Sequence, residues 1–405
     1  MSPSGVSASK GYDVVVVGAG VIGLSVAWQL ARAGRRVVVC DPVPATGASR
    51  VAAGMLAPVT EVHFGETGLL GLTLAGAAMW PRFAEELTEA SQCDVGYRAT
   101  GTVVVARDHD DRRDLDRLRT FAETLGLVME PLGSKEIRAR EPLLAPDVRG
   151  GLWVPGDHSV DNRALLSALN SACHRAGVEV VHQQVARVDV SADRATGVTL
   201  IDTERIAADV VVLAAGAWSR QIGGLEDGVL PPVRPVRGQA LRLHRDRGGL
   251  GDLPTPRTTV RGLVKGRSVY VVPRGGGEVV VGATSDEVGY EPHATAGSVW
   301  ELLNDARALL PSLNEMTFVE ASAGLRPGTP DNVPLVGRSR LSGLLMATGH
   351  YRNGILLAPI TAEHIVGLLD AHDSPSQEAG RYDAWDPRRF ESATSPQLVG
   401  VGESR

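Results

Sequence analysis

The chain has 405 residues, which is long enough for two domains or for one large domain with an elaborated lobe. Hydrophobic residues make up 43% of it, so a sizeable buried core is expected, whereas aromatic residues make up only 4%. The net charge of -6 and the scarcity of aromatic rings argue against nucleic acid or an anionic membrane as a partner.

Cysteine usage points to a reducing compartment. Cys40, Cys93 and Cys173 are odd in number and form no CxxC pair, so we expect free thiols and a cytoplasmic protein. Residues 1–11 are rich in small polar residues and predict a flexible leader rather than a signal peptide. No segment reaches the roughly 18 apolar residues of a membrane span. The histidines lack the spacing of metal ligands, so no metal site is expected.

The first forty residues predict a βαβ unit. The β-branched run at 12–17 is typical of a strand buried on both faces, as in a parallel sheet. Residues 21–32 predict a helix closed by Gly34, and residues 36–41 a second strand. Strand, glycine turn, helix and strand within about 30 residues form the unit that commonly binds nucleotides.

The later elements alternate between two kinds of pattern. Helices are expected at 78–92, 108–126, 163–176, 294–310 and 360–369, and strands at 101–106, 178–181, 185–190, 207–216 and 344–348, the last two fully buried. Residues 236–283 combine short strands with glycine-rich turns, which indicates an antiparallel sheet. The last 30 or so residues are polar and contain Pro and Ser, so we expect a loosely held tail.

The glycine turn after the first strand predicts a dinucleotide site. Its fingerprint is Gly18, Ala19, Gly20, Val21, Ile22 and Gly23. Gly18 permits the tight turn, Gly20 lets the backbone approach a pyrophosphate, and Gly23 lets the helix pack closely. The positive end of the helix dipole then faces the phosphates. Asp41 follows 18 residues after Gly23, where a carboxylate can bind ribose hydroxyls and disfavours a 2′-phosphate.

Other segments indicate how a long cofactor would be held. Residues 46–60 are rich in small side chains, which allow close approach to a bulky ligand. The strand at 207–216 ends in glycine, as a second holding point for FAD would require. The fingerprint alone leaves both a flavin and a nicotinamide cofactor open.

Several motifs together resemble a known family. Besides the fingerprint they are residues 53–58 (AGMLAP), 208–219 (ADVVVLAAGAWS), 324–331 (GLRPGTPD) and 349–359 (GHYRNGILLAP). They resemble the D-amino-acid oxidase family of flavoproteins, and the segments 53–58 and 349–359 resemble the ThiO-type glycine oxidases of thiamine biosynthesis. The resemblance runs from about residue 12 to 371.

The resemblance implies an α/β fold, in which a Rossmann-type FAD-binding domain is interleaved with a substrate domain built on an antiparallel sheet. Together with the pattern of elements and the composition, it assigns 12–90, 150–235 and 320–371 to the FAD-binding domain and 91–149 and 236–319 to the substrate domain. The polar ends at 1–11 and 390–405 are expected to be flexible tails. The FAD is expected to be non-covalent, because sarcosine oxidases that attach flavin use a cysteine in the C-terminal half and none follows Cys173.

The resemblance also implies site residues. Arg326 matches the arginine that binds the substrate carboxylate, Tyr270 the tyrosine that assists it, and Arg352 a second arginine near the substrate. No general acid or base is assigned. The fingerprint, Asp41, Arg326 and Arg352 are all expected to contact the cofactor. The further expected contacts are Ala48, Ser49, Arg50, Ala52, Ala53, Gly54, Met55, Val185, Ala215, Gly216, Trp218, His350, Asn353, Gly354 and Ile355.

The implied reaction is oxidation of glycine by O2 to the oxo acid, ammonia and hydrogen peroxide, with sarcosine and small D-amino acids as further candidate substrates. Ser268 and Ser285 flank the expected pocket where related enzymes carry bulkier residues, so larger amines are open as substrates. A sarcosine or D-amino-acid oxidase or dehydrogenase is the nearer alternative. An FAD-containing tRNA-modification or assembly protein and a nicotinamide-dependent dehydrogenase are the others. The resemblance further implies a homotetramer and a functional link to thiazole synthase.

Overall fold

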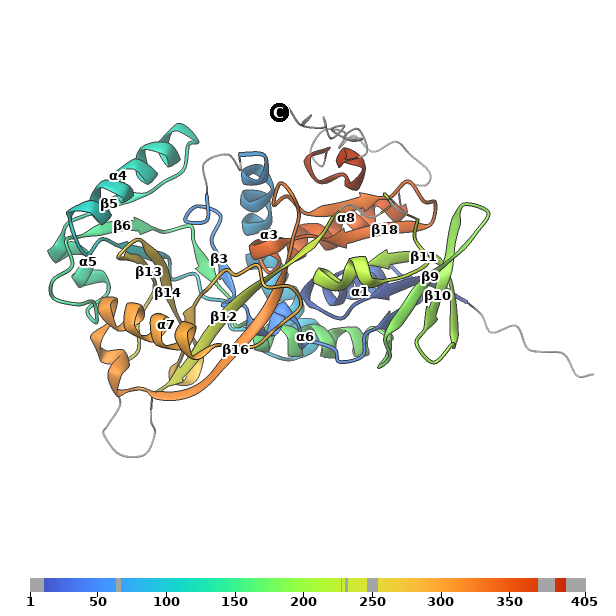
Figure 1. Ribbon diagram of the computed structural model, residues 1–405, viewed down its shortest axis with the longest axis horizontal. Helices are drawn as coiled ribbons and strands as arrows, with labels where there is room; N and C mark the ends of the chain where they lie inside the picture. Colours follow the sequence, from blue (N-terminus) through green and yellow to red (C-terminus); the bar gives the residue numbers. More distant parts are fainter. Residues whose placement is uncertain are drawn as a thin grey trace, which may run out of the picture.

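The computed structural model describes residues 11–62, 67–226, 228–229, 232–245, 254–370 and 383–390. Within these residues the chain forms two large sheets that lie side by side in an elongated molecule (Figure 1). The expected tail at 1–11 lies outside the described residues except for Gly11, and that at 390–405 except for Phe390. No described helix is both long enough and apolar enough to cross a membrane.

Parallel strands form the centre of the first sheet. Strand β1 (Tyr12–Val17) pairs in parallel with β2 (Val37–Cys40) and β11 (Arg205–Leu213), and β11 pairs in parallel with β18 (Leu344–Thr348). The remaining strands are β8 (Glu179–Val181), β9 (Val185–Ser191), β10 (Arg194–Leu200) and β17 (Leu335–Arg338). The predicted βαβ unit is therefore present at the middle of the sheet.

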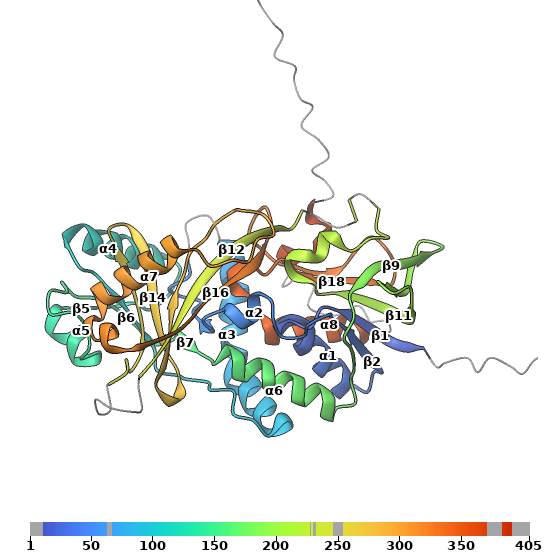
Figure 2. The same ribbon diagram turned by 60° about the horizontal axis from the view of Figure 1, so that its bottom comes forward.

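Helices bury one face of this sheet. They are α1 (Val21–Arg32), α3 (Thr67–Ser91), α6 (Asn162–Arg175) and α8 (Ala358–Asp370), which gather beside the sheet in Figure 2. Trp28 and Trp80 are fully buried between them, and the Trp80 indole N–H donates a hydrogen bond to the Leu356 carbonyl at 3.0 Å. The bounds of α1 agree with the sequence prediction, because its glycine turn and closing glycine mark both ends.

The prediction that residues 207–216 form a strand buried throughout is wrong for its first half. Burial alternates over the first six residues of β11, and only its last three are buried without interruption. The cause is a change of partner, since the first half pairs in antiparallel fashion with β10, a strand that the sequence analysis did not identify. Only the second half lies between β1 and β18 at the centre of the sheet.

The second sheet contains the antiparallel strands expected for residues 236–283. Its strands are β4 (Thr102–Val105), β5 (Glu130–Leu132), β6 (Gly151–Val154), β12 (Arg234–His244), β13 (Thr259–Val264), β14 (Arg267–Pro273), β15 (Glu278–Gly282) and β16 (Thr317–Gly328). Helices α4 (His109–Thr124) and α5 (Ser134–Arg140) lie at its outer end (Figure 1). Helix α7 (Ala296–Leu309) packs against one face, toward which Val269 and Val271 point. Tyr270, between them, points to the opposite face because side chains alternate along a strand.

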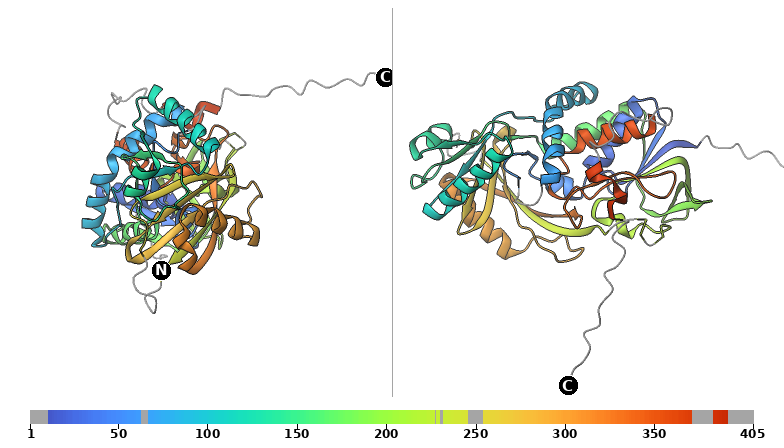
Figure 3. Two further views of the ribbon diagram at one scale, coloured as in Figure 1. Left: turned by 90° about the vertical axis from the view of Figure 1, so that its left-hand side faces the viewer. Right: turned by 90° about the horizontal axis from the view of Figure 1, so that it is seen from above.

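Two long strands join the lobes. Strands β12 and β16 pair from Arg234 with Gly328 to His244 with Thr317, and they run from the second sheet toward the first (Figure 1). Helix α3 lies where the two lobes meet (Figures 1 and 3). The boundaries between the two sheets differ from the expected domain boundaries at 150 and 320. Strand β6 and most of β16 fall within the expected FAD-binding domain, but both strands pair in the second sheet.

The expectation of a loosely held C-terminal tail is wrong for residues 383–390. Trp385 is fully buried and stacks on His364 of α8, with ring centroids 5.8 Å apart. Arg389 pairs with Asp331 at 2.9 Å and donates to the Val333 carbonyl. The polar composition of the segment conceals these few anchoring side chains, which the pattern analysis did not single out.

Because His364 is partly buried, we expect the free energy of unfolding to fall in acid. Burial lowers the pKa of His364 to about 4, although Asp386 opposes the shift. Between pH 6.5 and about 4 the unfolded chain therefore binds a proton that the folded protein does not, so the free energy of unfolding falls as the pH falls through this window. His364→Phe keeps a stacked ring without a titrating group. We expect a shallower pH dependence in urea unfolding of this variant.

The control for this prediction is His109→Gln, which changes an exposed histidine at the start of α4. We expect the control to follow the wild-type pH dependence. A His364→Phe variant that loses stability as steeply as the wild type between pH 6.5 and about 4 would contradict the assignment.

Candidate active site

A single cavity of about 780 Å³ lies at the junction of the two lobes. Its lining begins at the glycine turn between β1 and α1 and continues past the ends of β2 and β11. It then reaches β12, β14 and β16 of the second sheet and the residues just before α8. One continuous space therefore connects the predicted nucleotide site with the predicted substrate site.

The glycines of the fingerprint are required by close backbone contacts. A Cβ on Gly18 would lie 2.6 Å from the Ala214 carbonyl oxygen, and the residue has a φ of +105°. A Cβ on Gly23 would lie 1.9 Å from the Gly18 carbonyl oxygen. Gly23 thus serves the turn itself and does not line the cavity, whereas residues 18–22 do. The N-terminal turn of α1, whose first N–H groups have no partners within the helix, lies at the cavity wall.

Asp41 and Ser49 hold this turn in place. One carboxylate oxygen of Asp41 accepts from the Ala19 N–H at 2.8 Å and the other from the Val43 N–H at 2.9 Å. The Ser49 hydroxyl oxygen accepts from the Val21 N–H at 3.1 Å. Both side chains also line the cavity, and a carboxylate has lone pairs left for ligand hydroxyls.

The segment of small residues forms another wall. It contains α2 (Ala48–Val51) and β3 (Met55–Leu56), which pairs with β7 (His158–Ser159). The predicted cofactor residues that line the cavity here and beyond are Ala48, Ser49, Ala52, Ala53, Gly54, Met55, Val185, Ala215, Gly216, Trp218, His350, Asn353, Gly354 and Ile355. Arg50 is exposed and does not line it, so the prediction of a cofactor contact there is not supported by its position.

Tyr270 and Arg326 meet on the cavity face of the second sheet. Each lies over a glycine: a Cβ on Gly282 would be 2.3 Å from the Tyr270 hydroxyl oxygen, and one on Gly238 would be 2.3 Å from the Arg326 guanidinium carbon. Ala240 pairs with Gly282, which makes Gly238 and Gly282 diagonal neighbours on one face. The absence of side chains at these glycines leaves room for both polar groups.

The electrostatics favour a neutral Tyr270 that donates a hydrogen bond. Burial raises the pKa of the Tyr270 phenol, and the charge of Glu61 raises it further, while Arg326 and Arg261 act in the opposite direction. The phenol therefore keeps its proton at neutral pH. A protonated hydroxyl beside a guanidinium is a suitable pair for binding a carboxylate.

Arg352, the third predicted substrate residue, is paired in this structure. Its Nε lies 3.0 Å from one Glu61 carboxylate oxygen, and the other oxygen pairs with Arg261. All three side chains line the cavity. Arg261 lies directly opposite Tyr270 in the pairing of β13 with β14. Neither Glu61 nor Arg261 lies in a motif that marked it as a site residue in the sequence.

A buried aspartate holds the chain that leads to Glu61. Asp157 accepts from the N–H groups of Val59 and Thr60 at 3.0 and 2.8 Å, and from the Thr60 hydroxyl. Arg261 in turn donates to the Thr60 hydroxyl oxygen at 3.1 Å. The chain before Glu61 is therefore fixed to the second sheet.

Removing the carboxylate of Glu61 is expected to destabilise the protein. In Glu61→Gln the two arginines lose their shared counter-charge while mostly shielded from water. We expect the free energy of unfolding to fall by about 3 kcal/mol, as is typical when one partner of a buried ion pair is removed. Urea unfolding measures this change. Glu123→Gln is the control, because its ion pair with Arg119 on α4 is exposed and should contribute under about 1 kcal/mol. Equal losses in both variants would contradict the prediction.

His350 is a structural part of the wall. Its Nε2 lies 2.9 Å from the Thr361 hydroxyl oxygen of α8, and burial lowers its pKa to about 3. The imidazole is therefore neutral throughout the physiological range. It orients the following turn, Tyr351–Asn353, rather than carrying a positive charge into the cavity.

The residues of the cavity fit FAD. The glycine turn and Asp41 lie at one end, as a pyrophosphate and a ribose require, and small residues at 52–54 and 215–216 leave space for a long ligand. Gly54 has a φ of +65°, and a Cβ there would lie 2.0 Å from the Val160 carbonyl oxygen. Glycine is therefore required here because the chain packs closely against the Val160 backbone at the cavity wall.

Comparisons with known proteins agree with this assignment. The family model described as FAD dependent oxidoreductase (DAO) matches residues 13–368. The chain is 33% identical to a glycine oxidase of Geobacillus kaustophilus, over 90% of this chain and 94% of the relative. A crystal structure of glycine oxidase from the same organism superposes with a TM-score of 0.82 at 32% identity, covering 93% of this chain and 98% of that one.

A second kind of relative is longer. The chain is 36% identical to a bifunctional protein ThiO/ThiG of Synechocystis sp., over 96% of this chain and 55% of the relative. The chain thus spans about half the length of the bifunctional relatives that it matches. Because the family model covers nearly all of the described residues, this chain belongs to the DAO family of FAD-dependent oxidoreductases.

Proposed function

We propose that this protein uses FAD to oxidise glycine with O2 to the imine and hydrogen peroxide, and that water hydrolyses the imine to glyoxylate and ammonia. The observation that carries the proposal is the meeting of Arg326 and Tyr270 at one end of a cavity whose other end is a dinucleotide-type glycine turn. A guanidinium and a phenol together suit the carboxylate of a small amino acid. The glycine oxidase relatives support the choice of substrate.

In this proposal the protein binds and orients, and FAD when bound supplies the acceptor of a hydride from the substrate Cα. Arg326 holds the substrate carboxylate, and the Tyr270 hydroxyl donates a hydrogen bond to the same group. The substrate amine enters oxidation in its neutral form. No acid or base is assigned, because the phenol of Tyr270 keeps its proton and the imidazole of His350 is already engaged by Thr361.

One feature of the chain suits non-covalent binding of the flavin, and a second suits the negative charge of a reduced flavin. Burial raises the pKa of the Cys40 thiol to about 12, so this cysteine at the cavity wall is not a thiolate that could attach a cofactor. Helix α8 begins at Ala358, next to residues 353–356 of the cavity wall. Its positive N-terminal end favours negative charge in that part of the cavity.

The test is anaerobic addition of glycine to the purified yellow protein. Bleaching of the flavin absorption, followed by peroxide formation when O2 is admitted, is the expected result. A rate panel with glycine, sarcosine, D-alanine and D-proline then ranks the substrates. A strong preference for D-proline, or a flavin that glycine does not reduce, would overturn the proposal.

The nearer alternative is a sarcosine or D-amino-acid oxidase or dehydrogenase of the same family. The observation that favours it is that Ser268 and Ser285 both line the cavity, where their small side chains leave room for a larger amine. The same rate panel distinguishes these activities, and the yield of peroxide distinguishes oxidase from dehydrogenase.

The cellular setting is also proposed. We infer a cytoplasmic homotetramer with a functional link to thiazole synthase. The name of the ThiO/ThiG relative, which joins two activities in one protein, supports the link, and three free cysteines are compatible with a reducing compartment. Light scattering of the purified protein measures the oligomeric state, and cell fractionation tests the location.

A further inference from the structure

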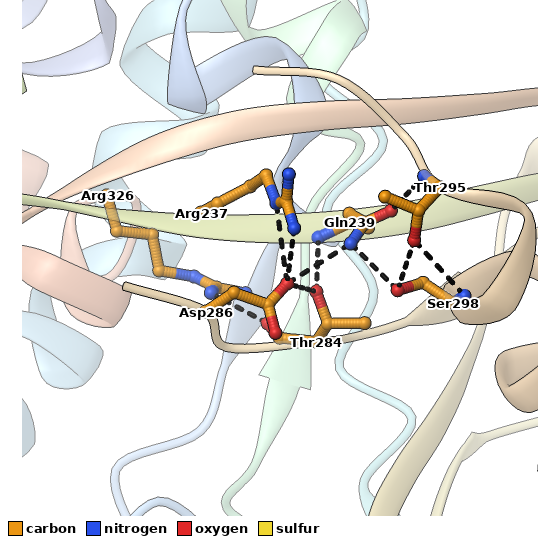
Figure 4. A network of polar contacts seen from close by, with 7 residues as sticks. All are labelled: Arg237, Gln239, Thr284, Asp286, Thr295, Ser298 and Arg326. Atoms are coloured by element: carbon orange, nitrogen blue, oxygen red, sulfur yellow. Dashed lines mark hydrogen bonds and ion pairs between the residues drawn. The ribbon is translucent and has the colours of Figure 1, made fainter. Parts of the chain in front are cut away.

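The guanidinium of Arg326 is held from two sides. Gly238 of β12 lies beneath it, as described above. From the other side Arg326 donates from Nη1 to the Thr284 carbonyl oxygen at 3.0 Å (Figure 4). The orientation of the proposed carboxylate-binding group therefore depends on where the chain places the carbonyl of Thr284.

Thr284 belongs to a segment that continues from β15 alongside β12. The Gln239 N–H donates to the Thr284 hydroxyl oxygen at 3.2 Å, and the Thr284 N–H donates to the Gln239 carbonyl oxygen at 3.3 Å. Two residues on, Arg237 and Asp286 exchange backbone hydrogen bonds of 2.8 and 2.9 Å. These bonds attach residues 284–286 to β12, although the regular strand ends at Gly282.

The side chain of Gln239 connects this segment with the start of α7. It is only 1% exposed. Its amide nitrogen donates to the Asp286 carboxylate at 3.1 Å and to the Ser298 hydroxyl oxygen at 2.8 Å (Figure 4). Its amide oxygen accepts from the Thr295 N–H at 2.7 Å. Each polar atom of a deeply buried amide is therefore satisfied, which makes the group costly to replace.

The Asp286 carboxylate is the point at which the network converges. The same oxygen that accepts from Gln239 also accepts from the Thr284 hydroxyl at 3.0 Å and lies 3.4 Å from the Arg237 guanidinium. Gln239 thus holds Asp286, and Asp286 holds Thr284, whose carbonyl contacts Arg326. Thr295, the N-cap residue of α7, and Ser298 in its first turn anchor the far side of the network.

We propose that Gln239 is a positioning residue for Arg326, because it holds residues 284–286 against β12 and so places the Thr284 carbonyl that orients the guanidinium. The inference rests on the proposed function, in which Arg326 binds the substrate carboxylate. Gln239 itself acts through its neighbours. Its loss should therefore weaken carboxylate binding while leaving the rate at which bound substrate is oxidised nearly unchanged.

The test uses Gln239→Met in the intact holoenzyme, which keeps a buried side chain of similar length but removes the amide. The readouts are KM and kcat for glycine and the Kd of acetate, measured from the perturbation of the flavin absorption spectrum. We expect KM and the acetate Kd to rise about tenfold, equivalent to about 1.4 kcal/mol, while kcat changes much less.

A double-mutant cycle separates positioning from general destabilisation. Gln239→Met is repeated in an Arg326→Lys background, where the fork of the guanidinium is already lost. If Gln239 acts through Arg326, the second substitution has almost no further effect on the acetate Kd. An undiminished tenfold loss in that background would overturn the proposal, as would acetate binding by Gln239→Met at wild-type strength.

Asp305→Asn is the matched control. Asp305 is a buried α7 residue that pairs with Arg267 of β14 and does not line the cavity, so the variant weakens the same helix without touching residues 284–286. We expect its acetate Kd to be that of the wild type, and an equal rise in both variants would overturn the proposal. Acetate binding can be measured even if glycine fails to reduce the flavin, so the failure of the proposed function is distinguishable from the failure of this inference.

Discussion

Arg326→Met is expected to lower kcat/KM for glycine by about a thousandfold, corresponding to about 4 kcal/mol of lost interaction with the substrate carboxylate. The large effect follows from the position of the side chain. Its partly buried guanidinium lies in the cavity over Gly238, beside the phenol of Tyr270. Since Arg326 lowers the pKa of Tyr270, its removal should also raise the pKa of the phenol further.

Steady-state kinetics with glycine, together with the visible spectrum and the melting temperature, check this prediction. The spectrum should remain that of a flavoprotein, because Arg326 lies at the substrate end of the cavity. Arg113→Met removes an exposed arginine on α4 and is the control, with wild-type kinetics expected. If Arg326→Met kept kcat/KM within a few-fold of the wild type, the carboxylate would have to bind elsewhere.

Gly23→Ala is expected to yield a protein without bound flavin and with much reduced stability. The added methyl group would lie 1.9 Å from the Gly18 carbonyl oxygen, so either the turn or the start of α1 must move. Overpacking of this kind costs about 1–3 kcal/mol or more. It also disturbs the N-terminal turn of the helix, where the pyrophosphate is expected to bind.

The flavin content of the purified variant and its urea unfolding curve measure both effects. Gly71→Ala is the matched control, because Gly71 lies in the exposed part of α3 with nothing near the position of a Cβ. Alanine in a helix is favoured over glycine by up to about 1 kcal/mol, so the control should be as stable as the wild type or more so. A yellow Gly23→Ala protein of wild-type stability would show that the turn can adapt.

Much of the fold could be predicted, because its main signals are local. The glycine turn and Gly34 mark the ends of α1, and continuous β-branched runs mark the central parallel strands. The missed β10 and the divided environment of β11 could not be predicted in this way. A single strand that pairs with an antiparallel neighbour along its first half and with parallel neighbours along its second carries two burial patterns, and neither spans enough residues to be recognised.

The site was predictable where residues belong to motifs. Arg326, Tyr270 and Arg352 all line the cavity, but the ion pairs of Arg352 and the presence of Arg261 depend on three segments that are distant in the sequence. One signal did exist. The two-residue turn Lys265–Gly266, with both residues at positive φ, sets the register of a hairpin that places Arg261 opposite Tyr270. No comparable signal indicated Glu61, whose role depends on the packing of the two lobes.

The paired strands β12 and β16 have a consequence for how this enzyme could change over evolution. They carry Gly238, Gln239 and Arg326 and run between the lobes, so the backbone sets the distance from the cofactor site to the proposed carboxylate-binding group. Ser268 and Ser285, by contrast, are exposed residues at the margin of the second sheet. If the proposed function holds, exchange of these marginal side chains would alter the amine that is accepted, while the backbone framework that carries the proposed carboxylate-binding arginine would stay the same.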